Sequence, residues 1–152
     1  MLESIMRLFE APDSGQRAAA LAQHEQRLAA AALLVHAAQV DGEYSEAERQ
    51  RLTSLLEERF SLGRLELAEL LGTAEIEERE AVDLYRFTSV LARHLDQPGR
   101  QAIVEMLWEV AMADGTVHEF EDNLVWRVAE LLGVSARDRI RLRKEVAARQ
   151  ER

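Results

Sequence analysis

The sequence predicts an all-α protein, a single compact bundle of about seven helices. Only two prolines and seven glycines occur among its 152 residues. Ala, Leu, Glu and Arg are abundant, and these residues lose little free energy on entering a helix. No segment shows the alternation of apolar and polar residues that is typical of a half-buried strand. A chain of this length can bury a hydrophobic core of its own.

The first sixteen residues are expected to form a short amphipathic helix and a connector. Apolar side chains are interleaved with charged ones over residues 1–10, and the apolar run is too short and too charged for a signal peptide. Pro12 and Gly15 then interrupt the chain, as is typical of a connector. Residues 17–152 are expected to form the helical domain.

In the first half of that domain, the sequence predicts a long helix over about 17–40, followed by shorter helices. Ser45 with Glu48 three residues later is typical of a capping box at a helix start. A further helix is expected from Ser61 to Gly72, with Leu62, Leu65, Leu70 and Leu71 facing inward. One or two more helices are expected over about 75–95.

The second half repeats this organisation after a break at residues 96–99. A helix is expected over 103–113 and another over 118–132, with Leu131 inward and Gly133 as its C-terminal cap. Ser135 opens a basic C-terminal helix over about 135–150. The segments 28–40 and 103–113 are apolar nearly all round, so we expect them to form the buried central pair.

An internal repeat relates the two halves. Shifting the chain by 73 residues aligns Asp41-Gly42 with Asp114-Gly115 and Glu48 with Glu121, and the flanking apolar positions agree. The repeats run over about 28–60 and 101–133. They predict two helix-loop-helix units packed about a pseudo-twofold axis.

Two interpretations of the repeated acids remain open. Asp41, Glu48, Asp114 and Glu121 could act only in turns and at helix N-termini. Alternatively, the two loops meet at one end of the bundle and the four carboxylates converge on a divalent cation. Because oxygen is the only donor offered, Ca²⁺, Mg²⁺ or Mn²⁺ would be preferred over softer metals.

The spacing of each motif equals that of the second half of an EF-hand loop. An EF-hand also requires ligands four and two residues before the aspartate. Those positions hold Ala37 and Gln39 in one copy, and Val110 and Met112 in the other. The sequence therefore excludes an ordinary EF-hand.

Three segments carry a resemblance to a known family. ARHLD from Ala92, LWEVAMADG from Leu107 and AELLGV from Ala129 resemble the TerB-like family associated with tellurite resistance, over about residues 24–148, and specifically its stand-alone bacterial branch. The resemblance implies a bundle of about seven helices whose recurrent acids bind a metal. It also implies a role in stress response, without defining a reaction.

Charge and composition exclude several classes of function. The absence of cysteine excludes disulfides and thiolate chemistry, and no nucleophile with a base, phosphate-binding loop or cofactor motif is present. The net charge is −9, yet residues 134–152 carry seven basic residues against three acids, so the first 133 residues sum to −13. Nucleic acid is not an expected partner, because most of the chain repels phosphate.

The sequence thus predicts a non-catalytic, cytoplasmic helical module that binds a protein partner or another copy of itself. It has no expected transmembrane segment, and peripheral membrane association is compatible with it. Two alternatives remain: a purely structural or oligomerisation module without a metal, and an acid–base enzyme.

Overall fold

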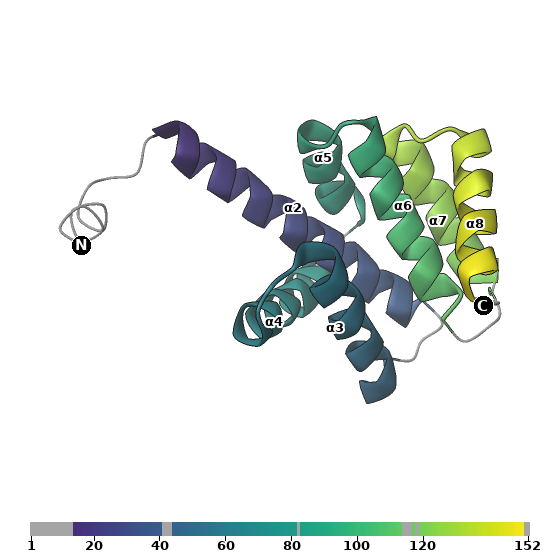
Figure 1. Ribbon diagram of the computed structural model, residues 1–152, viewed down its shortest axis with the longest axis horizontal. Coiled ribbons are helices and arrows are strands. Elements are labelled where there is room, and N and C mark those ends of the chain that lie inside the picture. The colour runs from purple at the N-terminus through teal and green to yellow at the C-terminus, as the bar shows by residue number, and fades with distance from the viewer. Residues whose placement is uncertain (1–13, 41–43, 82, 114–116, 118, 151–152) are drawn as a thin grey trace.

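The computed structural model describes residues 14–40, 44–81, 83–113, 117 and 119–150. Within these residues the chain forms seven helices and no strand, so the all-α prediction is confirmed (Figure 1). The helices are α2 (Ser14–Gln39), α3 (Glu46–Phe60), α4 (Arg64–Glu80), α5 (Tyr85–His94), α6 (Gln97–Ala111), α7 (Glu119–Leu132) and α8 (Ala136–Gln150). The amphipathic helix expected over residues 1–10 lies outside the described residues.

Helices α2 and α6 form the centre of the bundle and pack against each other. In α2, residues 29–35 are all buried, and in α6 the buried set includes Val104, Leu107 and Trp108. Both helices are apolar on more than one side, which requires neighbours on several faces. The prediction of a buried central pair is confirmed.

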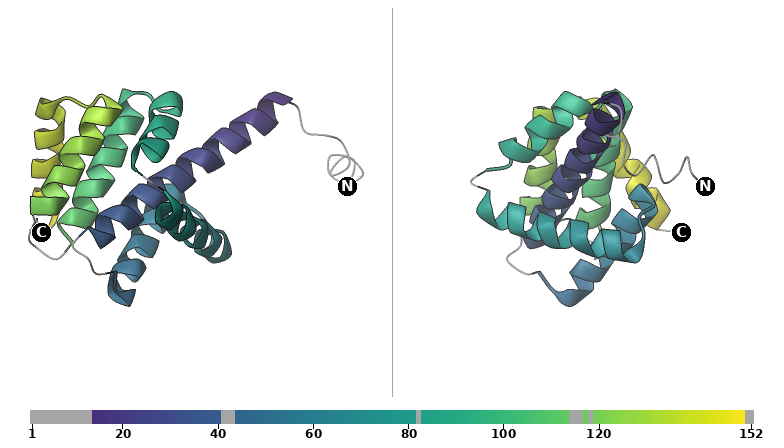
Figure 2. Two further views of the ribbon diagram at one scale, coloured as in Figure 1. Left: turned by 180° about the vertical axis from the view of Figure 1, so that it is seen from behind. Right: turned by 90° about the vertical axis from the view of Figure 1, so that its left-hand side faces the viewer.

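The remaining helices cover this pair in a pattern that repeats along the chain. Helix α4 packs on α2 in the first half, as α8 packs on α6 in the second. Helices α3 and α7 each follow a central helix and contact both it and the helix after it. Figure 2 shows the two groups from behind and from one end, with α5 lying against α2 and α7.

The features predicted at two helix ends are confirmed, at Ser135 and at Gly133. The break expected at residues 96–99 is instead the first turn of α6, which begins at Gln97, and the Asp96 side chain accepts from the backbone N–H of Gly99 at 3.0 Å there. The Ser135 side chain accepts from the N–H of Asp138 at 3.1 Å at the start of α8. Gly133 has φ of +71°, a left-handed conformation that glycine adopts without steric cost after a helix.

Helix α4 differs from the sequence prediction. It begins at Arg64 and continues through Gly72 to Glu80, although a helix from Ser61 to Gly72 was expected. An interior glycine lowers helix stability only modestly, and the stripe of Leu67, Leu70, Leu71 and Ala74 against the core offsets that cost. This stripe fixes the rotation of α4, so Leu65 faces outward and is 85% exposed.

Leu131 of α7 was also expected to face inward and is 41% exposed. The buried side of α7 is set by Leu124, Val128 and Leu132. At the angle of about 100° per residue in a helix, Leu131 lies at the border of that stripe. The burial of Leu132 therefore leaves Leu131 at the surface.

The N-terminal half of α2 projects beyond the bundle (Figure 1). Nearly all its residues from Gly15 to Glu25 are exposed, and the burial of α2 begins near Leu28. Leu21 is 60% exposed. The helix also starts at Ser14, three residues before the start expected from the sequence.

Two leucines of α4 test the assigned orientation of this helix. Leu71 is 1% exposed and Leu65 is 85% exposed. We expect Leu71→Ala to lower the free energy of unfolding by about 2–5 kcal/mol, because it leaves a cavity in the core. Leu65→Ala should change it by less than about 0.5 kcal/mol. Urea denaturation of both variants in dilute solution measures the difference, and equal losses would contradict the orientation of α4.

Candidate functional site

The C-terminal ends of α2 and α6 lie side by side at one end of the bundle (Figures 1 and 2). The two Asp-Gly loops connect these ends to the starts of α3 and α7. Asp41 and Asp114 lie outside the described residues, as does His118. Of the four predicted ligands, the structure therefore places Glu48 and Glu121.

A cavity of about 310 Å³ opens between these helix ends, and both glutamates line it. Glu48 comes from α3, and Glu121 from α7. The rest of the lining combines buried or half-buried apolar residues with polar and charged ones, most of them exposed. It comprises Ala37, Ala38, Arg51, Leu52, Ser54, Leu55, Glu58, Glu109, Val110, Ala111, Ala113 and Gln150.

Glu48 also takes part in the cap of α3. The Ser45 hydroxyl accepts from the backbone N–H of Glu48 at 3.2 Å and donates to the Glu48 Oε1 atom at 3.2 Å. The predicted Ser45 cap is confirmed, although the Glu48 carboxylate bonds the Ser45 hydroxyl instead of the backbone N–H of a standard capping box. Glu48 thus has a structural role whether or not it binds a cation.

Glu121 is the one buried charged side chain in the part of the chain that the structure describes, at 7% exposed. It lies in the first turn of α7, where the helix dipole favours a negative charge. Burial of a carboxylate costs free energy unless polar or cationic partners compensate it. A buried acid at this position is therefore a specific feature of the site.

Glu48 and Glu121 fit a hard divalent cation in their donor chemistry, because both offer carboxylate oxygen and both line the same cavity. Among the described residues, no group of three or more His, Cys, Asp or Glu residues is arranged to hold a metal. Ala113, the residue before Asp114, also lines the cavity. A complete ligand set would need the loop residues as well.

An ion-pair network borders the cavity. Arg59 of α3 contacts Glu105 at 3.0 Å and also pairs with Glu109, both on α6. Arg149 of α8 contacts the same two carboxylates at 2.7 and 3.3 Å. Partial burial raises the pKa of Glu105, but hydrogen bonds from Arg59 and Arg149 outweigh burial and hold that pKa below its usual 4.5. The network joins α3, α6 and α8.

Sequence reasoning did not identify this network. Glu105 and Glu109 are four residues apart, which places them on one face of a helix, but their arginine partners are 40 or more positions away in the chain. The available signal was the pair of acids on a helix that is otherwise mostly apolar. Such a pair implies cationic partners from other helices.

The described histidines and the two tryptophans lie outside the lining of the cavity. The Nδ1 atom of His36 lies 3.0 Å from Glu78, and His94 lies 3.5 Å from Glu25. Trp108 is buried and its indole N–H donates to the Arg139 carbonyl at 3.1 Å. Trp126 is half exposed. The described histidines are absent from the cavity lining.

None of the helices, over the residues that the structure describes, has an apolar stretch long enough to cross a membrane.

The fold and the cavity define an all-helical module in which two related helix-loop-helix units place acids at one shared end. A profile of the family described as tellurite resistance protein TerB matches residues 27–144, most of the chain. The chain belongs to the TerB family. Comparisons with curated proteins and with solved structures gave no match.

The depressed pKa of Glu105 predicts a pH dependence of stability. A carboxyl group whose pKa is lower in the folded state stabilises the fold at pH values above its unfolded pKa, and the contribution is lost as the pH falls through the folded value. We expect the difference in unfolding free energy between wild type and Glu105→Gln to shrink as the pH is lowered from about 6 to about 3.

Urea denaturation across this pH range measures that difference. The exposed acid Glu66 supplies a control with the same change in charge, and Glu66→Gln should differ little from wild type at any of these pH values. A difference for Glu105→Gln that stays constant with pH would show that the network contributes through packing alone.

Proposed function

We propose that this protein is a non-catalytic module that binds a divalent cation at the cavity between its two helix-loop-helix units and acts by binding another protein. The observation that carries the proposal is that Glu48 and Glu121, which occupy equivalent positions in the repeat, line one cavity. Symmetry of sequence alone would not require two acids from distant helices to share a cavity.

The electrostatics of the cavity support a cation. Glu58 and Glu109 also reach its lining, and carboxylates brought close together repel one another unless a positive charge compensates them. Arg51 and the Arg59 network supply part of that compensation. A Ca²⁺, Mg²⁺ or Mn²⁺ ion held by Glu48, Glu121, Asp41 and Asp114 would supply the rest, with water completing its shell.

The role of a binding module is supported by the residues that surround the cavity. A hydrolytic site would need a nucleophile hydrogen-bonded to a base that activates it. Among the described lining residues the one hydroxyl is that of Ser54, and no hydrogen bond joins it to a carboxylate. The family description links the chain to tellurite resistance. We therefore expect a cytoplasmic role in stress response that depends on a protein partner.

A second candidate function is a purely structural module without a metal. It is favoured by the hydrogen bonds between Ser45 and Glu48, which a helix cap alone would explain. The two candidates differ in their response to added cation.

Calorimetric and thermal-melt titrations with Ca²⁺, Mg²⁺ and Mn²⁺ test the proposal. We expect at least one ion to bind wild type and to raise its melting temperature, because a ligand specific to the folded state stabilises it by about 2.7 kcal/mol at 100 times its dissociation constant. Glu48→Gln/Glu121→Gln and Asp41→Asn/Asp114→Asn should each lose both effects.

The matched control is Glu66→Gln/Glu69→Gln on the exposed face of α4, which changes the net charge by the same amount. This variant should titrate like wild type. If wild type neither binds nor gains stability with any of these ions at millimolar concentration, the acids act as helix caps and the structural candidate is correct.

A further inference from the structure

We propose that this protein assembles head to tail with further copies of itself, with the outer face of α4 in one copy docking into a groove between α7 and α8 of the next. This inference rests on the protein-binding part of the proposed function and names the partner. It is independent of the cation, because neither surface includes a residue of the cavity.

The groove is defined by apolar side chains from two helices. Trp126 of α7 is 50% exposed and Ile140 of α8 is 46% exposed. Both line a hollow of about 470 Å³, to which Trp108 also contributes. An exposed tryptophan beside an exposed isoleucine in a concave surface is typical of an interface anchor site.

The two walls of this groove carry opposite charges. Arg139 and Arg143 line the α8 wall, and Asp122 lines the α7 wall, where it pairs with Arg143 at 3.2 Å. On α7, the exposed acids Glu119 and Glu130 share a face with Trp126. The groove therefore offers an apolar centre with one basic and one acidic side.

The outer face of α4 has the same three-part arrangement. Leu65 and Ile76 are 85% and 49% exposed and are eleven residues apart, about three helical turns, so they lie on one stripe. Glu69 and Glu80 each follow one of them by four residues and lie on one flank of the stripe. The opposite flank carries Arg64 and Arg79, and all four charged residues are exposed.

These two surfaces complement each other when the acidic flank of α4 meets the α8 wall and its basic flank meets the α7 wall. The distribution of charge along the whole chain also favours a contact between α4 of one copy and α8 of another. Residues 44–83 carry eleven acids against five arginines, whereas residues 134–152 have a charge of +4. Long-range attraction would bring the two ends of different copies together.

The mixed charge of the groove favours a second copy over a uniformly anionic partner. A lipid surface or a nucleic acid would place phosphates against both walls, and the acids Glu119, Asp122 and Glu130 would repel them. An α4 helix of another copy instead presents charges of each sign in the required places. The arrangement also fixes the direction in which α4 lies.

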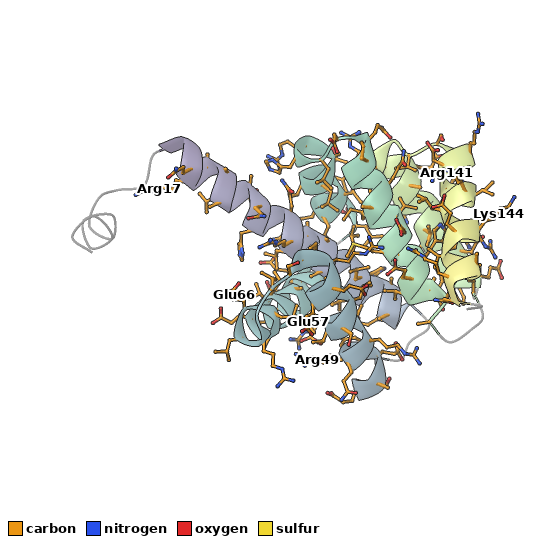
Figure 3. All side chains as sticks on the ribbon, in the orientation of Figure 1. Arg17, Arg49, Glu57, Glu66, Arg141 and Lys144 are labelled. Atoms are coloured by element: carbon orange, nitrogen blue, oxygen red, sulfur yellow. The ribbon has the colours of Figure 1, made fainter. Side chains whose placement is uncertain are left out.

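The two surfaces lie on different sides of the molecule, with α8 at one end of the long axis and α4 beside α2, whose N-terminal half extends past it (Figures 1 and 2). Figure 3 shows Glu66 of α4 and Lys144 of α8 projecting away from each other. A contact between different surfaces of identical chains is heterologous, so it forms open chains or rings and not a closed twofold dimer.

One helix in one groove buries less area than a standard stable interface, so the assembly should be weak and sensitive to salt.

Sedimentation velocity of the full chain over a range of concentrations tests the inference. Wild type should show a weight-average mass that rises with concentration past that of a dimer and falls toward the monomer in about 0.5 M NaCl. The groove variant Trp126→Ala/Ile140→Ala and the helix variant Leu65→Ser/Ile76→Ser should each be monomeric. An equimolar mixture of the two should form a discrete heterodimer and nothing larger, because each variant retains the surface that the other lacks.

The control is Leu21→Ser, which removes an exposed leucine outside both surfaces and should assemble like wild type. Wild type that stays monomeric at all concentrations would overturn the inference, as would a mixture of the variants that stays monomeric. One variant that still dimerises by itself would also overturn it, because that is the result expected of a twofold contact of one surface with itself. Binding of monomeric wild type to phosphatidylserine vesicles, lost in the groove variant, would assign the groove to a membrane and also overturn it.

Cation titration of the same variants separates this inference from the proposed function. Both variants leave the cavity intact and should bind the ion as wild type does. If cation binding persists while self-association is absent, the assembly is wrong and the cation site stands. If self-association is present without cation binding, the cation site is wrong and the assembly stands.

Discussion

The fold depends on the burial of two helices that are apolar around most of their circumference. Residues 29–32 of α2 are four consecutive alanines, all buried, and four consecutive residues point to all sides of a helix. Their small side chains allow neighbouring helices to approach closely from every direction. The helices α4, α5 and α6 pack against α2 for this reason, and α6 is in turn covered by α7 and α8. Once the two central helices are side by side, their C-terminal ends come to one end of the bundle.

Much of this architecture could be predicted from the sequence because the signals are local. The apolar circumference of α2 and α6, the Ser45 and Ser135 caps, and Gly133 are each specified by a few consecutive residues. The rotation of α4 was not predictable in the same way. Its sequence contains enough leucines for two apolar stripes, and only the packing of α4 against other helices decides that Leu67 and Leu71 are buried and Leu65 is not.

The candidate site was predictable in part, for a similar reason. The repeat identified Glu48 and Glu121 as equivalent acids, and the structure brings both to one cavity. The Arg59–Glu105–Glu109–Arg149 network was missed because it joins three helices that are distant in sequence. Hydrogen-bonding partners of this kind depend on the packing of whole helices. The network nevertheless contributes to the cavity directly, since Glu109 belongs to both.

The projecting half of α2 has a consequence for the local stability of the chain. A free helix of about twelve residues is marginal in water, so residues 14–25 depend on the buried half of the same helix for their structure. The closer a backbone hydrogen bond of α2 lies to the N-terminus, the further it is from the buried half of the helix, and the more easily it opens. Amide hydrogens along α2 should therefore exchange with solvent in a graded order, fastest near Gln16 and slowest near Val35, where opening requires disruption of the core. One continuous helix thus spans the range from local fraying to global unfolding.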